Sequence, residues 1–538
     1  MSNSISPLRS ASVVPYASTG FFNEIVLDYI SGKETLQPFY EHPVSWEGLE
    51  AAMRKRDKAP VNRTVLVQAL ENQYRAAGLD ADEKVTASIE LLKKTTTYTV
   101  CTAHQPNIFT GYLYFVYKIL HAIRLAEELK VKQPSADFVP VFYMGSEDAD
   151  LDELGKIFLS GDKLIWNTKQ TGAVGRMKTK GLEPILNRIQ GELSVLPFGE
   201  ELIQLLKKAY LESPDIQTAT FKLVHELFKA YGLVVLIADQ PELKRLMLPV
   251  FEEDLFSHTP SAIVTETNKR LSAGYKVQAN PREINLFYLE DGIRNRIEKQ
   301  GDGFSVVDTS LKFSSAELRT ELNAHPERFS PNVILRGLYQ ETILPNIAFI
   351  GGGGELAYWL ELKDLFYHYK VPYPVQVVRN SFLLVTHKTL GKIERLELEP
   401  VDFFQSAEQL LNELVKRDSS VQVHLTNEIR DTASFYQHLQ KLAGSIDTTL
   451  HPHVAALEKR MLKQLGELEK KMLRAEKRKF SDQSRQLKLI RSSLFPNNSL
   501  QERVENFLPY YAQYGPAFIE KMHRESTAID QQFIISIL

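Results

Sequence analysis

The chain has 538 residues, which exceeds the usual size of one hydrophobic core, so we expect two or three domains or one large domain with an excursion. Its hydrophobic fraction of 43% and charged fraction of 24% are typical of globular proteins, and no apolar segment reaches the roughly 20 residues that a membrane span needs. A formal net charge of −3 excludes a global preference for nucleic acid or for an anionic membrane.

The cysteine count and the N-terminus bear on localisation. A single cysteine, Cys101, excludes an internal disulfide and a zinc cluster of thiolates, and it fits a reducing compartment. Residues 1–22 lack the basic segment followed by a long apolar segment that a secretory signal needs. We therefore expect a cytoplasmic protein with no membrane partner.

Residues 1–95 are mainly helical in pattern, and we expect them to pack on the core. Ser45, with Glu47 in the following turn, is typical of a helix start, and residues 62–79 have the apolar spacing of another helix. These features indicate packing rather than chemistry.

We expect residues 96–385 to form the core of the protein. An apolar strand, a helix with a broad apolar face and a second apolar strand form a βαβ unit, whose strands should be parallel. A further helix and strand pair, a glycine-rich strand-to-helix turn and one more apolar strand follow. We expect an α/β fold with an open, doubly wound sheet, decorated by hairpin-like or amphipathic insertions at residues 157–180 and 285–308. The predicted strands and helices lie in residues 98–105, 111–130, 138–145, 221–239, 345–369 and 373–385.

Residues 386–495 change to long polar helices. One of them has apolar residues at the alternating spacing of four and three that is typical of a coiled-coil seam. From Val454 to Leu494 there are twelve Lys and Arg against five Asp and Glu, which could serve RNA but is more common on a solvated helical face or at a dimer contact. Residues 496–538 follow a turn and predict helices that return to the core. The seam residues are Met461, Leu465, Leu468, Met472 and Ala475.

Ligands of open α/β sheets bind beyond the carboxyl ends of the strands, so the loops there are candidate sites. The first loop, residues 102–112, has a turn shaped by Pro106 and Gly111 next to a helix N-terminus, which favours an anion. An ordinary capped loop is an equal alternative. Its candidate binding side chains are His104, Gln105, Asn107, Thr110 and Tyr112.

The second loop, residues 145–154, concentrates acidic side chains that would repel one another unless a cation, an amine or a proton relieves them. Glu153 and Leu159 stand where a calcium-binding EF-hand loop from Asp148 would need glycine and glutamate, so that reading is excluded. Magnesium held with a phosphate and a merely solvated loop both stay open. The candidate residues are Ser146, Glu147, Asp148 and Asp150.

The third loop is the glycine run of residues 351–354. Gly352, Gly354 and Ala357 match a permissive dinucleotide-binding fingerprint, but the acidic residue expected about 20 positions later is missing. Glu355 would oppose a pyrophosphate and fits a ligand with an ammonium or hydroxyl group. The alternatives are glycines that only allow tight packing, or an NADP-dependent oxidoreductase with Arg379 on the 2′-phosphate. Candidate residues are Gly352, Gly353, Gly354, Glu355, Tyr358 and Trp359.

Several motifs are absent. The chain has no Walker A loop, no His-Glu-x-x-His, no Gly-x-Ser-x-Gly and no Cys/His cluster, which disfavours P-loop NTPases, zincins and α/β hydrolases. We expect no metal site built by the protein alone. Cys101 lies in an apolar strand, and we interpret it as a buried small side chain rather than a nucleophile.

Taken together, the motifs resemble the bacillithiol-biosynthesis cysteine-adding enzymes, the BshC family. The matching segments occur in family order from about Thr97 to the C-terminus. They are residues 102–129, 138–154, 171–186, 330–362 and 495–522.

The resemblance implies a Rossmann-like core akin to class I aminoacyl-tRNA synthetases, inserted connecting segments, and a helical coiled-coil domain that forms a homodimer. It implies a ligase that adds L-cysteine to the amine of glucosaminyl-malate, the last step of bacillithiol synthesis. ATP and magnesium are candidate cosubstrates. However, residues 107–114 replace the synthetases' His-x-Gly-His motif, and their Lys-Met-Ser-Lys-Ser loop is absent.

The chain also departs from the family's own pattern. The family usually has Gly-Gln-Gln-Pro-Gly in the first loop and Asp-His-Asp in the acidic loop, where this chain has residues 103–107 and Asp148-Ala149-Asp150. His104 could take over part of the role of the histidine lost at Ala149.

Amide formation requires an activated carboxyl group and a neutral amine, so a carboxylate should remove a proton from the amine. We assign this task to Asp148 or Asp150, and ammonium binding to Glu355. Arg336 and the segment Thr110–Tyr112 would hold the malate carboxylates or a phosphate. Asn285 and Arg294 are further binding candidates.

Overall fold

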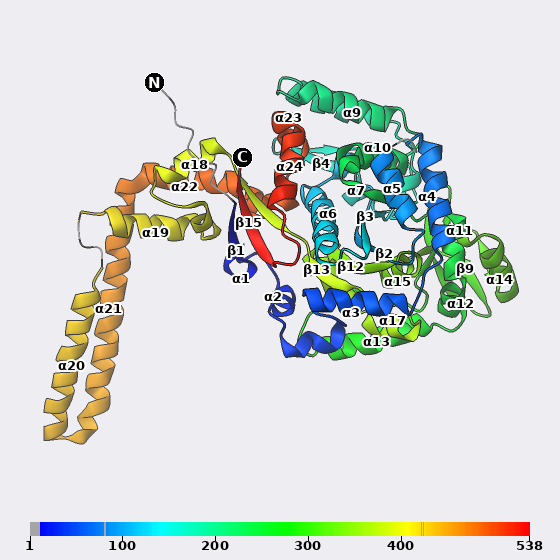
Figure 1. Cartoon of the computed structure of the whole chain (residues 1–538). Helices are drawn as coiled ribbons and strands as arrows, with labels where there is room; N and C mark the ends of the chain where they lie inside the picture. The colour runs from blue at the N-terminus through cyan, green and yellow to red at the C-terminus, as the bar shows by residue number, and fades with distance from the viewer. Residues whose placement is uncertain (1–10, 80–81, 421, 423) are drawn as a thin grey trace. The chain divides into compact units, whose positions relative to one another are not determined.

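The structure is a computed structural model, and it describes residues 11–79, 82–420, 422 and 424–538 (Figure 1). Within that part the chain forms two compact units. The sheet unit comprises residues 11–382 and 501–534, and the helical unit comprises residues 383–500 and 535–538. The four segments predicted from the sequence (1–95, 96–385, 386–495 and 496–538) stay a prediction, and their residues 1–10, 80–81, 421 and 423 lie outside the described residues.

A five-stranded parallel sheet forms the centre of the sheet unit. Its order is β13-β12-β2-β3-β6. Strands β3 and β6, which come next in the chain, lie on one side of β2, and the later strands β12 and β13 lie on its other side. That reversal is typical of a doubly wound sheet and marks the edge at which ligands bind. The strands are β2 (Thr97–His104), β3 (Asp137–Met144), β6 (Val234–Ile237), β12 (Asn346–Gly351) and β13 (Val375–Val378).

Helices cover both faces of this sheet. Neighbouring residues of a strand point to opposite faces, and in β3 Phe142 contacts Phe115 of α6 (Tyr114–Lys132), whereas Tyr143 contacts Tyr339 of α15 (Val333–Ile343). The predicted doubly wound α/β fold is therefore confirmed. The strands β2, β3, β6 and β12 are almost entirely buried, as expected of a sheet covered on both sides.

The helix cap predicted at Ser45 is confirmed, and the predicted helix at residues 62–79 also has a cap. Ser45 accepts the N–H of Gly48 at the start of α3 (Trp46–Asp57). Asn62 caps α4 (Arg63–Ala77) in the same way. Leu49 of α3 packs with Val100 of β2 and Ile350 of β12 in a buried cluster, so this helical segment completes the core of the sheet unit.

The single strand predicted at residues 373–385 is wrong, because the chain forms two strands there. Arg379 and Asn380 interrupt it: the Arg379 guanidinium donates to Glu502, and the Asn380 N–H donates to Nδ1 of His121. In the two residues between the end of β13 and the start of β14 (Ser381–Val385), these buried polar contacts replace the hydrogen bonds of a continuous strand. Strand β15 (Gln532–Ile537) and β14 carry the chain across the boundary between the two units.

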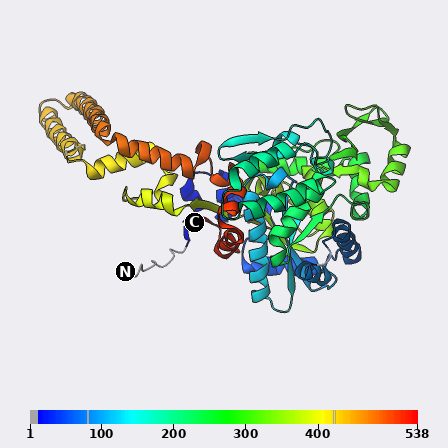
Figure 2. The same ribbon diagram turned by 90° about the horizontal axis from the view of Figure 1, so that it is seen from above.

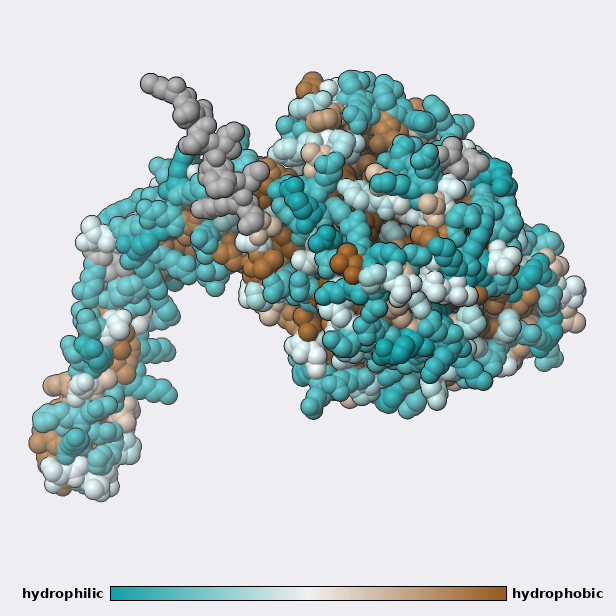
Figure 3. Space-filling model, in the orientation of Figure 1, coloured by the Kyte–Doolittle hydropathy of each residue, from teal (hydrophilic) through white to brown (hydrophobic). Residues whose placement is uncertain are grey.

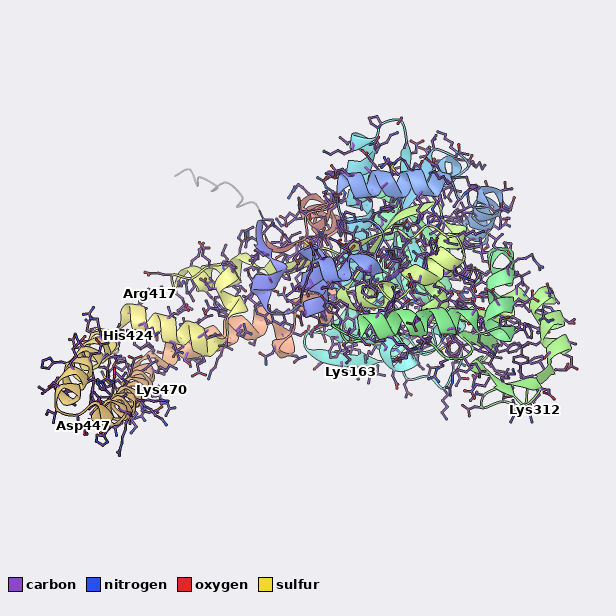
Figure 4. The ribbon with its side chains drawn as sticks, turned by 90° about the horizontal axis from the view of Figure 1, so that it is seen from below. Lys163, Lys312, Arg417, His424, Asp447 and Lys470 are labelled. Carbon is purple, nitrogen blue, oxygen red and sulfur yellow. The ribbon has the colours of Figure 1, made fainter. Side chains whose placement is uncertain are left out.

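Both predicted insertions contain hairpins. Residues 157–180 begin with the antiparallel pair β4 (Lys156–Leu159) and β5 (Asp162–Ile165), which carries Lys163 (Figure 4). Residues 285–308 belong to an antiparallel sheet of order β10-β9-β8-β7-β11, with Lys312 on its β10 strand (Figure 4). Its strands are β7 (Leu286–Glu290), β8 (Ile293–Gln300), β9 (Gly303–Val306), β10 (Lys312–Ser314) and β11 (Phe329–Pro331).

The remaining α-helices and the first strand of the sheet unit complete its outer layers (Figure 1). They are β1 (Ser12–Pro15), α1 (Tyr16–Thr19), α2 (Glu24–Ile30), α5 (Glu83–Leu91), α7 (Leu151–Leu154), α8 (Glu183–Leu193), α9 (Gly199–Leu211), α10 (Ile216–Phe228), α11 (Pro241–Lys244), α12 (Leu248–Phe256), α13 (Thr259–Leu271), α14 (Ser315–Ala324), α16 (Gly353–Trp359), α17 (Lys363–His368), α23 (Leu508–Tyr514) and α24 (Pro516–Glu525).

The helical unit contains a long antiparallel pair of helices, α20 (Thr426–Ile446) and α21 (His451–Lys477), which lie side by side (Figure 2). Asp447 lies at the turn that joins them (Figure 4). In the predicted seam, Met461 is 38% and Leu468 is 48% exposed, so the seam is only partly covered within the chain. The other helices are α18 (His387–Glu394), α19 (Ala407–Asp418) and α22 (Ser481–Leu494).

Candidate functional site

A cavity of about 540 Å³ lies in the sheet unit at the carboxyl ends of all five parallel strands. This is the edge at which ligands of doubly wound sheets bind, and the volume suits small molecules. The residues that follow the strands and line the cavity are His104 and Gln105 after β2, Gly145–Asp148 after β3, Ala238 and Asp239 after β6, Gly352–Glu355 after β12, and Arg379 after β13.

The glycine run of the third loop brings a carboxylate to the cavity wall. A Cβ atom at Gly353 would lie 2.9 Å from Cγ2 of Val26, so close packing against α2 requires glycine at this position. Glu355 follows in the first turn of α16, and its Oε2 accepts the N–H of Gly352 at 2.9 Å. The Glu355 side chain is 24% exposed, so a ligand in the cavity can contact it.

Lys118 of α6 is the cation closest to this carboxylate. Its Nζ donates to Glu355 Oε2 at 2.5 Å and to the Ala103 carbonyl at 2.6 Å, and the side chain is buried. Burial alone would raise the pKa of Glu355, but the Lys118 ammonium and the Gly352 N–H outweigh it and hold that pKa below its usual value. Burial lowers the pKa of Lys118, against the pull of Glu355.

The first loop joins the acidic loop through one glutamine. Gln105 Nε2 donates to Asp148 Oδ2 at 3.1 Å, and Gln105 Oε1 lies 2.6 Å from Nδ1 of His104. The backbone N–H of Gln105 also donates to His104 Nδ1, at 2.9 Å, so the ring is held against Gln105 by two contacts at the same nitrogen. Burial, together with the charge of Lys118, lowers the pKa of His104 to about 3, so the ring is neutral.

Asn107, Thr110 and Gly111 of this loop do not line the cavity, contrary to the prediction. The backbone turns sharply, with positive φ at Phe109, Thr110 and Gly111, and this turn buries the side chains of Asn107 and Thr110. Helix α6 begins at Tyr114, which lines the cavity together with Tyr112. The first-loop candidates that do line the cavity are His104, Gln105 and Tyr112.

Some side chains of the acidic loop line the cavity, whereas others bond only within the protein. Asp148 lines the cavity, with Oδ1 accepting the N–H of Asp150. Asp150 instead caps α7 by accepting the N–H of Glu153, and it lies outside the cavity. Ser146 and Glu153 are also lining residues.

Glu147 lines the cavity as well but pairs with protein cations. The buried Lys244 contacts both Glu147 and Asp239, and Asp239 also binds Arg176 through two bonds of 2.7 and 2.8 Å. Burial raises the pKa of Glu147, whereas Lys244 and Arg176 hold the pKa of Asp239 below its usual value despite its burial. This pair of carboxylates is already neutralised by the chain.

Three arginines that line the cavity, Arg294, Arg336 and Arg503, have no carboxylate within ion-pair distance in the described part of the chain. Arg294 donates to Ser330 Oγ and to the Pro331 carbonyl. Arg336 donates to the Tyr358 hydroxyl at 2.6 Å and contacts Gln340. Buried charges are normally paired, so these guanidinium groups favour an anionic ligand in the cavity.

Asn285 and Trp359 were predicted to contact substrate but lie in the interior. Asn285 Nδ2 and N–H donate to the two carboxylate oxygens of Asp254, and Asn285 Oδ1 accepts Nδ2 of Asn332. Trp359 is fully buried between Phe349 and Phe366, because α16 turns that face toward the core. Tyr358, its neighbour, does line the cavity.

The sequence analysis missed several lining residues. Lys118 could have been noticed as a lone cation on the apolar face of a predicted helix, whereas Arg503 comes from a distant segment and left no local signal. Cys101 is buried and burial raises its pKa, in agreement with its interpretation as a small core side chain. The missed residues include Tyr114, Lys118, Tyr143, Asp239, Asn332 and Arg503.

In the described ranges no group of three His, Cys, Asp or Glu side chains is placed to hold a metal ion. None of the helices in those ranges has the length and apolar character needed to cross a membrane.

These features define a small-molecule enzyme cavity in a doubly wound sheet. The family model "Bacillithiol biosynthesis BshC, N-terminal Rossmann-like domain" matches residues 10–380, and "Bacillithiol biosynthesis BshC, C-terminal coiled-coil domain" matches residues 382–538. The chain therefore belongs to the BshC family of bacillithiol biosynthesis. The predicted resemblance, the Rossmann-like core, the coiled-coil domain and the assignment as an enzyme are confirmed.

Individual relatives agree with the family match. A protein of Flavobacterium johnsoniae named "Putative cysteine ligase BshC" is 39% identical over 97% of this chain and 98% of its own length. One of Christiangramia forsetii with the same name is 38% identical over 97% and 98%. A solved structure titled as a putative arginyl-tRNA synthetase from Campylobacter jejuni is 9% identical over 79% of this chain and 98% of its own, but its TM-score of 0.24 is too low to support an argument.

Proposed function

We propose that this chain is a ligase that joins the carboxyl group of L-cysteine to the amine of glucosaminyl-malate, the last step of bacillithiol synthesis. One observation carries the proposal: a single cavity combines an ionised carboxylate, Glu355, with two arginines that lack carboxylate partners, Arg294 and Arg336. Substrates with an ammonium group and a dicarboxylate match that arrangement. The names of the relatives support cysteine as the group transferred.

The reaction requires activation of the cysteine carboxyl group, for which we propose ATP with magnesium as cosubstrate. Transfer of an adenylyl or phosphoryl group to a carboxylate oxygen provides a leaving group. The neutral sugar amine then attacks the carbonyl carbon, the C–N bond forms, and the C–O bond to the leaving group breaks. Magnesium needs only one or two carboxylates when phosphates are present, so the phosphates of ATP would supply most of its ligands.

Asp148 is also the residue that we propose to accept the proton from the sugar ammonium. It lines the cavity, and Gln105 fixes the orientation of its carboxylate. His104 contributes to the same arrangement, because its Nδ1 contacts both the backbone N–H and the side-chain Oε1 of Gln105. We do not assign this role to Asp150, because it does not line the cavity and its carboxylate caps α7.

The malate carboxylates would bind Arg294 and Arg336. Guanidinium groups bind carboxylates through paired, charge-assisted hydrogen bonds, which match a dicarboxylate in geometry and charge. Asn332, which caps α15, lines the same cavity and adds a helix N-terminus.

The geometry disfavours the oxidoreductase alternative. Arg379 would have to bind the 2′-phosphate of NADP, but its guanidinium donates to the buried carboxylate of Glu502 at 2.6 Å. Glu355 also occupies the first turn of α16, where a pyrophosphate would lie. The RNA-binding alternative rests only on the local charge of residues 454–494.

The test is product formation. Purified protein is incubated with glucosaminyl-malate and cysteine, with and without ATP and magnesium, and bacillithiol is measured by mass spectrometry. The proposal predicts bacillithiol that appears only in the complete mixture. Absence of product in every mixture, with the substrates shown to be intact, would contradict it.

We further propose that the protein is a cytoplasmic homodimer that pairs through α20 and α21. Exposed apolar side chains, among them Leu442, Ile446 and Leu468, support this pairing, and apolar side chains gather at the end of the helix pair near Asp447 (Figure 3). Replacing Leu465 and Leu468 by Asp should convert the dimer to a monomer in sedimentation. A dimer that survives both substitutions would exclude this surface as the contact.

A further inference from the structure

The carboxylate of Glu355 is used by the protein on one side only. The Lys118 ammonium and the Gly352 N–H both donate to Oε2. In the part of the chain that the structure describes, nothing donates to Oε1. Because Glu355 lines the cavity and its side chain is 24% exposed, Oε1 is available to a ligand.

The surroundings keep this carboxylate charged. The Lys118 ammonium is held in place by the Ala103 carbonyl, which prevents it from moving away from Glu355. A carboxylate with a pKa below its usual value is a weak base, so it is unsuited to taking a proton from a substrate. It is well suited to binding a group that stays positively charged throughout the reaction.

The two substrates differ in this respect. The sugar amine must lose its proton before it can attack the activated carboxyl group. The α-amine of cysteine takes no part in forming the new bond and can remain an ammonium group. A permanently ionised acceptor therefore matches cysteine better than the sugar.

We propose that Glu355 Oε1 accepts the α-ammonium group of cysteine, and that Lys118 is a positioning residue that holds Glu355 in place for this contact. The pair would then select an amino acid over a thiol acid without an amine. This inference rests on the proposed function and assigns one part of the cavity to one of its substrates.

The test compares equilibrium binding of L-cysteine with that of 3-mercaptopropionate, which has the same carboxyl and thiol groups but no amine. Titration calorimetry is carried out on the full chain and on Glu355→Gln, which keeps an acceptor for the Gly352 N–H. Wild type should prefer cysteine, and Glu355→Gln should weaken cysteine binding by about 10-fold or more while binding of 3-mercaptopropionate stays unchanged.

Lys118→Met gives a second, independent readout. Without the ammonium, Glu355 should take up a proton more readily, so cysteine binding should weaken progressively from pH 8 to pH 6 in this variant and stay constant in wild type.

Glu341→Gln is the matched control for Glu355→Gln, because Glu341 is a buried carboxylate paired with Arg56 that does not line the cavity. Its preference for cysteine should equal that of wild type.

The possible results separate the two proposals. Equal weakening of both ligands in Glu355→Gln, or an unchanged preference for cysteine, overturns the inference while bacillithiol formation by wild type still supports the ligase. Wild-type protein that neither binds cysteine nor forms bacillithiol overturns both. If Glu355→Gln does not fold, the pH dependence of Lys118→Met decides.

Discussion

Two carboxylates of the sheet unit, the buried Asp254 and the partly exposed Glu355, contrast in what their surroundings do to their charge. Asp254 of α12 accepts the N–H of Asn285 at 2.6 Å and its Nδ2 at 2.9 Å, and burial raises its pKa to about 7. Glu355 also accepts a backbone N–H, but Lys118 holds its pKa below the usual value. A neighbouring cation thus decides which carboxylate stays ionised.

The contrast separates structural groups from ligand-binding groups. Both oxygens of Asp254 are satisfied within the chain, and Asn285 links it to Asn332 at the start of α15. Glu355 uses one oxygen for the protein and leaves the other to the cavity. Charged groups that the chain leaves incompletely paired are therefore the ones we assign to substrate.

The largest expected effect is on catalysis, and it should differ between the two aspartates of the acidic loop, Asp148 and Asp150. Asp148→Asn removes the proposed proton acceptor and should lower kcat by roughly 10²- to 10⁴-fold. Asp150→Asn should change kcat only a few-fold, because Asp150 lies outside the cavity and caps α7. Both are measured as the rate of bacillithiol formation at saturating substrates. Equal losses in the two variants would contradict the division.

The next largest expected effect is on the KM for glucosaminyl-malate, and two arginines of one strand should differ in it. Arg294 lines the cavity without a carboxylate partner, whereas Arg296, two residues further along β8, pairs with Glu298 and does not line it. Arg294→Met should raise KM for glucosaminyl-malate by about 10- to 100-fold, because a charge-assisted contact is lost. Arg296→Met should leave this KM within about two-fold. Similar KM values in both variants would argue against malate binding at Arg294.

The smallest effect concerns stability. Between about pH 4 and pH 7 the folded protein holds a proton on Asp254 that the unfolded chain releases, so this contribution to stability falls as pH rises. The difference in unfolding free energy between wild type and Asp254→Asn should therefore shrink over this range, by roughly 4 kcal/mol at most.

Glu355 should behave in the opposite way. Its pKa is lowered, so its contribution is present above the ordinary glutamate pKa and is lost as the solution becomes more acidic. Urea unfolding followed by fluorescence reports on the sheet unit, because Trp46, Trp166 and Trp359 all lie there. If the difference in unfolding free energy from wild type changed with pH in the same direction for Asp254→Asn and for Glu355→Gln, the contrast would be contradicted.

The sequence predicted the sheet and its three loops because both rest on local patterns. Buried strands followed by polar loops located His104, Asp148 and Glu355 at the correct edge, and the pattern that follows Gly352 located the start of α16. Periodicity did not show the break at Arg379, which depends on Glu502 more than a hundred residues later.

The site residues were harder to predict for the same reason. Asn107 and Thr110 are turned inward by a backbone with positive φ, and Asn285, in a loop, is held by Asp254 of helix α12. Lys118 and Arg503 reach the cavity through tertiary packing. Local sequence shows which loops meet at the sheet edge, but it does not show which way each side chain points.

The most direct measurement is a crystal structure of the protein with glucosaminyl-malate and cysteine bound. Our account predicts the malate carboxylates on Arg294 and Arg336 and the cysteine α-ammonium on Oε1 of Glu355. Substrates bound elsewhere, with these three side chains left without ligand contacts, would contradict it.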